Sequence, residues 1–173
     1  MTKLNPSPDQ MPKDRFIAVF GGIYEHSPWV AEAVFDAGIG PEDADPLHLA
    51  GRMAVIVEAG SRDRQMALLR AHPELAGKLA IAGTLTAEST AEQAGAGLDQ
   101  CSPDEFDAFQ DLNRRYRDKF GHPFIIAVRG LDRAAILTAF RQRIRNSPDA
   151  EFTAALSEVH KIARLRLVQL ADA

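Results

Sequence analysis

His72 is the residue whose type and position best suit acid–base chemistry. It precedes Pro73, and because a residue before proline is pushed out of the helical region, we expect a helix to end here. A helix C-terminus favours the protonated imidazole, and such a histidine can act as a general acid or base near neutral pH. The alternative interpretation is that His72 is a satisfied surface or helix-capping group.

A second set of polar residues follows, in which Ser89, Glu92 and Gln93 would lie on one helical turn. A hydroxyl, a carboxylate and an amide in that arrangement suit a ligand rich in N–H and C=O groups, such as a urea. Ser89 and Glu92 also have the spacing of a capping box, in which they would only satisfy the backbone at a helix start. Capping does not explain Gln93.

Arg166 lies on the apolar face of the last predicted helix, between Ala163 and Leu170. An arginine aimed into a core stays charged, so it needs an anion or a carbonyl as its partner. A bound substrate would provide that partner, and so would an internal salt bridge. A third alternative is that the side chain extends to the rim of the helix and reaches water.

Helices must position these residues, because the helical spacing of apolar residues dominates the sequence. We predict an all-α fold, a single compact multi-helix domain over 13–173, preceded by a flexible N-terminal arm over 1–12. One β-like run covers 124–128. The predicted helices lie near 13–21, 28–37, 46–59, 61–71, 74–82, 89–97, 103–120, 132–145 and 148–170.

The helix predicted over 103–120 has the clearest local signals. Ser102 and Glu105 have the spacing of a capping box, and Gly121 follows the last helical residue. Asn113 falls within the apolar stripe, so its buried amide needs partners, either in a structural network or in a binding site. The basic residues near the end match the helix dipole, which favours a solvated helix end over a nucleic-acid surface.

The composition narrows the class of protein. The chain has 173 residues, a formal net charge of -4 and a single cysteine, Cys101, which favour a cytoplasmic globular domain without a disulfide or a nucleic-acid partner. No apolar run is long enough for a membrane span, and we see no signal peptide. The five histidines lack metal-ligand spacing, and no nucleophile signature surrounds Cys101, so we expect no metal and no cysteine catalysis.

Blocks of the sequence resemble the family of 2-oxo-4-hydroxy-4-carboxy-5-ureidoimidazoline decarboxylases, called OHCU decarboxylases. The blocks are YEHSPWVAE at 24–32, AHPELAG at 71–77, LTAESTAEQAG at 85–95, NRRYRDKFGHPFII at 113–126, EFTAAL at 151–156 and IARLRL at 162–167. They keep their order over most of the chain, which makes the resemblance specific. One departure is His122, where we expect an apolar or aromatic residue between Gly121 and Pro123.

The resemblance implies an all-helical homodimer, without metal or organic cofactor, that converts OHCU to (S)-allantoin and CO2 in urate degradation. It implies that His72 is the catalytic acid–base group, with Glu92 and Arg166 beside it around one small cavity. It further implies substrate contacts from Pro73, Ser89, Gln93 and the backbone of Phe124, Ile125, Ile126, Ala127 and Val128.

Two alternatives remain beside this interpretation. In the first, the chain is a non-catalytic helical interaction module, in which the polar residues only cap helices and pair with one another. In the second, it is an enzyme of the same architecture that acts on a related ureido or purine-derived compound.

Overall fold

The predicted all-α class is confirmed. The structure, a computed structural model, describes residues 2–77 and 83–173, and within these ranges it contains helices and no strand. The helices are α1 Lys13–Phe20, α2 Trp29–Asp36, α3 Pro46–Glu58, α4 Arg62–Arg70, α6 Ala87–Gly95, α7 Pro103–Phe120, α8 Arg133–Arg143 and α9 Pro148–Asp172. Short 3-10 helices cover Pro8–Gln10, Pro41–Ala44 and Leu98–Gln100. No helix in the described part of the chain is both long enough and apolar enough to cross a membrane.

The helix predicted over 74–82 is wrong over its first residues. Residues 74–77 form turns and irregular backbone, for a reason given with the site below. The remainder, 78–82, lies outside the described residues.

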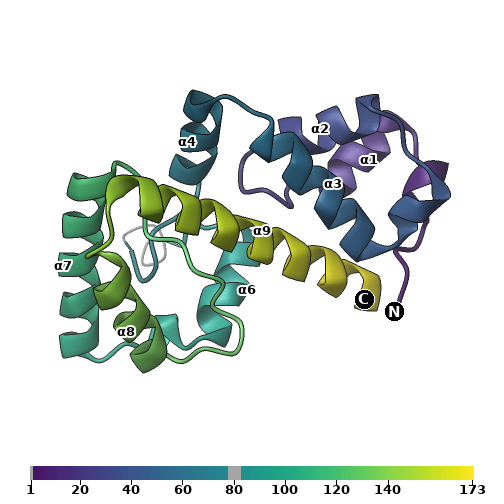
Figure 1. Ribbon diagram of the computed structural model, residues 1–173. Helices are drawn as coiled ribbons and strands as arrows, with labels where there is room; N and C mark the ends of the chain where they lie inside the picture. Colours follow the sequence, from purple (N-terminus) through teal and green to yellow (C-terminus); the bar gives the residue numbers. More distant parts are fainter. Residues whose placement is uncertain (1, 78–82) are drawn as a thin grey trace. The chain divides into compact units, whose positions relative to one another are not determined.

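The chain forms two compact units. Unit 1 comprises Met1–Ala71 and Val159–Ala173, and unit 2 comprises His72–Glu158. In unit 1, α2 packs against both α1 and α3 (Figure 1). The three helices bury apolar side chains that include Phe16, Phe20, Val30, Val34, Leu49 and Met53.

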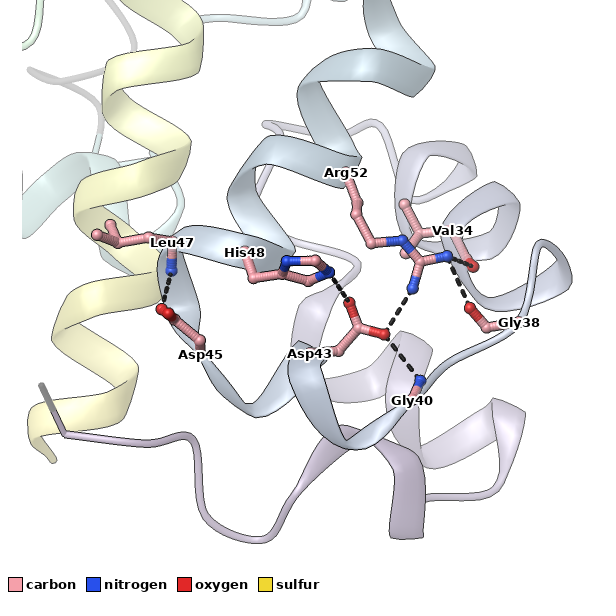
Figure 2. Close-up of polar contacts among 8 residues, drawn as sticks. All are labelled: Val34, Gly38, Gly40, Asp43, Asp45, Leu47, His48 and Arg52. Atoms are coloured by element: carbon pink, nitrogen blue, oxygen red, sulfur yellow. Dashed lines mark hydrogen bonds and ion pairs between the residues drawn. The ribbon is translucent and has the colours of Figure 1, made fainter.

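The connection 37–45 between α2 and α3 is held by an ion pair in unit 1 (Figure 2). The buried Asp43 carboxylate accepts hydrogen bonds from Arg52 Nη1 at 2.5 Å and from the Gly40 N–H at 2.9 Å. Arg52 also donates through Nη2 to the Gly38 carbonyl at 2.6 Å. One guanidinium from α3 therefore fixes both the charge and the backbone of this connection.

The segment before α1 packs on unit 1. Leu4, Pro8 and Met11 are buried, and the Leu4 N–H donates to the Ala44 carbonyl at 2.8 Å. The flexibility expected for residues 1–12 stays a prediction.

In unit 2, α7 and α8 lie side by side (Figure 1). Both caps predicted for α7 are confirmed: Ser102 and Glu105 bond to each other's backbone N–H groups at 3.2 and 3.1 Å, and Gly121 ends the helix at φ 76°. The apolar stripe of α7 is buried in a core that includes Phe109, Leu112, Tyr116, Phe120, Phe124, Ile136 and Phe140. This rigid helix can therefore present its other side chains at fixed positions.

Candidate active site

His72 lies two residues beyond the last residue of α4, Arg70, as predicted from Pro73. Its exposed fraction is 8%. A solvent-exposed surface group would not be buried to this degree, so the surface alternative is wrong, and the helix-capping alternative stays open. An imidazole buried on a short, stiff connection is a suitable acid–base group, because its position is restricted before any ligand arrives.

The residues that follow His72 turn tightly instead of forming a helix. Ala76 has φ +49°, a left-handed conformation that is uncommon for residues other than glycine. Gly77 allows a close approach, because a Cβ added there would lie 2.8 Å from Glu74 Cβ. A helix cannot pass through this geometry, which explains why the helix predicted over 74–82 does not form over 74–77.

Side chains from α6 and α7 hold this connection. From α6, Gln93 Oε1 accepts the Ala76 N–H at 3.1 Å, and its Nε2 donates to the Glu74 carbonyl at 3.2 Å. Arg117 of α7 pairs with the Glu74 carboxylate at 2.7 Å.

Two amides of α7 also bind this connection. Gln110 Nε2 donates to the Ala76 carbonyl at 2.7 Å, and Asn113 Nδ2 donates to the Leu75 carbonyl at 2.9 Å. The structural network considered for Asn113 is therefore present.

The capping-box interpretation of Ser89 and Glu92 is wrong. The N-cap of α6 is Thr86, whose hydroxyl accepts the Ser89 N–H at 3.3 Å, so Ser89 and Glu92 lie inside the helix. Ser89 and Gln93 are buried, whereas Glu92 is half-buried. Capping therefore does not explain the side chains of Ser89, Glu92 and Gln93. All three lie on adjacent turns of α6.

Arg166 is buried in unit 1, as the apolar pattern of the last helix predicts. Its Nη1 donates to Glu25 Oε2 at 2.9 Å and to the Gly22 carbonyl at 3.3 Å. An internal salt bridge is therefore present, and it fixes the guanidinium among buried groups. The other candidate residues belong to unit 2, and the meeting of Arg166 with them around one cavity stays a prediction.

The β-like run 124–128 has no regular secondary structure and no strand pairing among the described residues. Phe124 stacks on Phe140 with ring centroids 3.9 Å apart. Arg143 Nη1 donates to the Ile125 carbonyl at 2.5 Å, and the Ala127 N–H donates to Glu158 at 2.9 Å. Side chains of unit 2 thus fix this backbone where a strand partner would otherwise do so.

The departure at His122 has a structural explanation. The imidazole is 2% exposed and lies against aromatic rings, 5.5 Å from the Tyr116 centroid and 6.2 Å from that of Phe120. Its Nδ1 lies 2.9 Å from the Pro123 carbonyl oxygen. His122 therefore occupies the place of the aromatic residue expected there and satisfies its polar atom locally.

Unit 2 also contains a cavity of about 500 Å³. Of the residues predicted to contact a substrate, only Gln93 is among the described residues that line it. Most of the others are apolar, and they include Leu85, Ala94, Leu98, Pro103 and Phe106.

Neither a metal cluster nor an activated thiol is evident in the described ranges. Across 2–77 and 83–173, no three His, Cys, Asp or Glu side chains are grouped as metal ligands would be. Burial, together with the nearby Glu105 carboxylate, raises the pKa of Cys101. A raised pKa disfavours the thiolate, so it fits the expectation that Cys101 is not a nucleophile.

Comparison with known proteins decides the family. The model of the family described as OHCU decarboxylase matches residues 9–168. The chain belongs to the OHCU decarboxylase family. Among its relatives, a 2-oxo-4-hydroxy-4-carboxy-5-ureidoimidazoline decarboxylase of Haloferax volcanii is 43% identical over 162 residues, covering 93% of this chain and 92% of the relative. The mouse (Mus musculus) protein of the same description is 39% identical over 175 residues, covering 100% of this chain and 93% of the mouse protein.

Solved structures place this member of the OHCU decarboxylase family in the same fold. A crystal structure of (S)-allantoin synthase superposes with a TM-score of 0.73 at 34% identity, covering 94% of this chain and 52% of that one. The chain therefore spans about half the length of that protein. A crystal structure of OHCU decarboxylase in the presence of (S)-allantoin superposes with a TM-score of 0.68 at 21% identity, covering 94% of this chain and 100% of that one.

Proposed function

We propose that this chain decarboxylates OHCU to (S)-allantoin and CO2 in urate degradation. The observation that carries the proposal is the similarity to relatives described as OHCU decarboxylases, which extends over nearly the whole length of both chains. The buried His72, on a connection that other side chains hold, supplies a suitable acid–base group.

The substrate itself explains why such a reaction needs no organic cofactor. The departing carboxylate is bonded to a carbon that carries a hydroxyl and adjoins a ring C=N. When the bond to CO2 breaks, its electron pair moves toward the imine, and the ring nitrogen takes a proton. The resulting enol becomes a carbonyl as the carbon that carries the ureido group takes a proton. Because the imine accepts the electrons, the protein has only to bind, orient and move protons.

We propose that His72 transfers the proton on the substrate hydroxyl and ring system. General acid–base help from a positioned histidine is typically worth about 10²–10⁴ in rate. The remaining acceleration would come from orienting the carboxylate perpendicular to the ring, so that the breaking bond overlaps the imine.

We assign recognition of the ureido group to Glu92, Gln93 and Ser89 on α6. A carboxylate accepts hydrogen bonds from N–H groups, whereas a hydroxyl and a side-chain amide can each donate and accept hydrogen bonds. Each polar atom of the Gln93 side chain has capacity for two hydrogen bonds, so Gln93 can hold the connection after His72 and also contact a substrate. Pro73 and the backbone of 124–128 would complete the substrate contacts.

We further propose that Arg166 binds a carboxylate or carbonyl of the substrate. Its ion pair with Glu25 fixes the plane of the guanidinium. A fixed, planar guanidinium matches a carboxylate in a way that a lysine cannot.

We propose a cytoplasmic homodimer, with residues 1–12 as a flexible arm on the helical domain 13–173. Light scattering coupled to size-exclusion chromatography of the full chain measures the mass of the assembly. A monomer mass across the micromolar range would contradict the homodimer.

Circular dichroism during turnover of freshly generated OHCU tests the proposed reaction. The expected result is a signal of (S)-allantoin that grows faster than in the spontaneous reaction. Decay of OHCU at the spontaneous rate would overturn the proposal. In that case, activity on a related ureido compound would favour the second enzyme, and inactivity on all of them would favour the interaction module.

A further inference from the structure

We infer that Gln110 and Asn113 of α7 are positioning residues for His72, a role that rests on the proposed function of that histidine. They reach it through the connection 71–77. Both bind the backbone that follows the imidazole, at the Ala76 and Leu75 carbonyls.

Ala76 is held in an unfavourable backbone conformation from both sides. Its φ of +49° costs free energy for a residue with a Cβ, and such residues persist only when their surroundings hold them. Gln93 binds the Ala76 N–H, and Gln110 binds the Ala76 carbonyl, at 3.1 and 2.7 Å. The two peptide groups that flank this residue are thus fixed by different helices.

The backbone between Ala76 and His72 is short and includes Pro73. Only three residues separate His72 from Ala76, and the first of them is Pro73. Proline fixes its own φ and restricts the residue before it, so few torsions remain free between the two positions. We therefore expect a change at Ala76 to move the imidazole.

Asn113 is a costly residue at its position if stability alone is considered. The side chain is 3% exposed, and among the described residues its Oδ1 has no hydrogen-bond partner, while Nδ2 binds the Leu75 carbonyl. A buried acceptor without a partner is destabilising. Its neighbours on α7, Phe109 and Leu112, are buried and apolar. An amide here is explained by the need to hold the connection.

Gln110→Glu tests the inference, because the carboxylate keeps the shape and loses the N–H donor. The matched control is Gln65→Glu in unit 1, where a buried glutamine likewise donates to a backbone carbonyl, that of Val57, at 3.1 Å. Both variants should melt at lower temperature than the wild type. Only Gln110→Glu should lower kcat for OHCU, by about 10–100-fold with KM nearly unchanged, since a misplaced group costs rate on this scale.

The NMR signal of the His72 ring separates this inference from the proposed reaction, because it needs no turnover. Gln110→Glu should shift or broaden that signal, and Gln65→Glu should leave it unchanged. If Gln110→Glu does not fold, Gln110→Ala and Asn113→Asp provide the same test. An unchanged His72 signal together with wild-type kcat in the folded variants would overturn the inference. If the His72 signal shifts in Gln110→Glu but the wild-type protein is inactive on OHCU, the positioning role stands and only the proposed reaction is overturned.

Discussion

Two connections, 37–45 between α2 and α3 and 71–77 after α4, are both held by side chains, but with different chemistry. The first uses charge: Arg52 binds the buried Asp43 carboxylate and a backbone carbonyl (Figure 2). The second combines one ion pair, between Arg117 and Glu74, with neutral amides, among them Gln93 and Gln110, that bind backbone groups. Amides fix a backbone without adding a charge of their own beside a histidine. We expect the first connection to serve stability and the second to serve His72 as well.

The largest expected effect comes from the histidine on the amide-held connection. His72→Asn should lower kcat/KM for OHCU by at least about 10²-fold, because the acid–base group is lost. The melting temperature should stay close to that of the wild type. Rates are measured from the circular dichroism of (S)-allantoin, and melting by the helical signal at 222 nm.

The matched control is His48→Asn beside the charged connection. His48 is half exposed, and its Nε2 lies 3.7 Å from Asp43 Oδ1. This variant should retain wild-type kcat. Equal losses of activity in the two variants would contradict the different roles of the two connections.

Arg166→Lys should have the next largest effect on rate. Arg166 and Arg52 are bound in similar ways, each by a carboxylate and a backbone carbonyl, so ion pairing alone does not identify a functional arginine. We expect about a 10–100-fold loss of kcat/KM in Arg166→Lys, since an ammonium lacks the planar fork. Arg52→Lys should keep wild-type kinetics. Steady-state rates over a range of OHCU concentrations compare the two, and normal turnover in Arg166→Lys would remove Arg166 from the site.

Arg52→Ala should reduce stability without reducing turnover. Removing one partner leaves the Asp43 carboxylate buried without its ion pair, and such changes cost about 3–5 kcal/mol in fully buried pairs. The Arg52 side chain is 25% exposed, so we expect a smaller loss, about 2–3 kcal/mol. Urea unfolding gives this value. A loss below about 0.5 kcal/mol would show that the charged connection is not a main source of stability.

Glu105→Gln should have the smallest effect, and one that depends on pH. The Ser102 N–H and then Arg133 lower the pKa of Glu105 in the folded chain. A lowered pKa in the folded state adds stability above the unfolded pKa, and this is lost as the pH falls through the folded value. The melting temperature of the variant should therefore lie slightly below that of the wild type at pH 7 and converge with it in acid. A difference that does not shrink as the pH falls through the range in which carboxyl groups titrate would contradict this explanation.

Local signals predict the helices well, because they need only neighbouring residues. The capping box of Ser102 and Glu105 and the terminal Gly121 mark both ends of α7. The predicted start of α6 at 89 differs from the observed start at Ala87, because two cap signals overlap. Thr86, not Ser89, is the N-cap.

The contacts that hold the connection 71–77 and Arg166 join partners far apart in the sequence, so local patterns could not predict them. Gln110 lies 34 residues from Ala76, and Glu25 lies 141 residues from Arg166. The left-handed Ala76 follows from such contacts and not from its own propensity. Of the candidate site, the sequence identifies the side chains with suitable chemistry, and it misses the amide donor Gln110 that supports them.

Turnover of freshly generated OHCU by folded Gln110→Glu and Arg52→Ala, measured side by side, tests the different roles of the two connections most directly. Both variants are assayed well below their melting temperatures, so that unfolding does not limit the rate. The predicted result is wild-type kcat for Arg52→Ala despite its lower stability, and at least about a 10-fold lower kcat for Gln110→Glu. Equal kcat values in the two variants, or a larger loss in Arg52→Ala, would contradict the account.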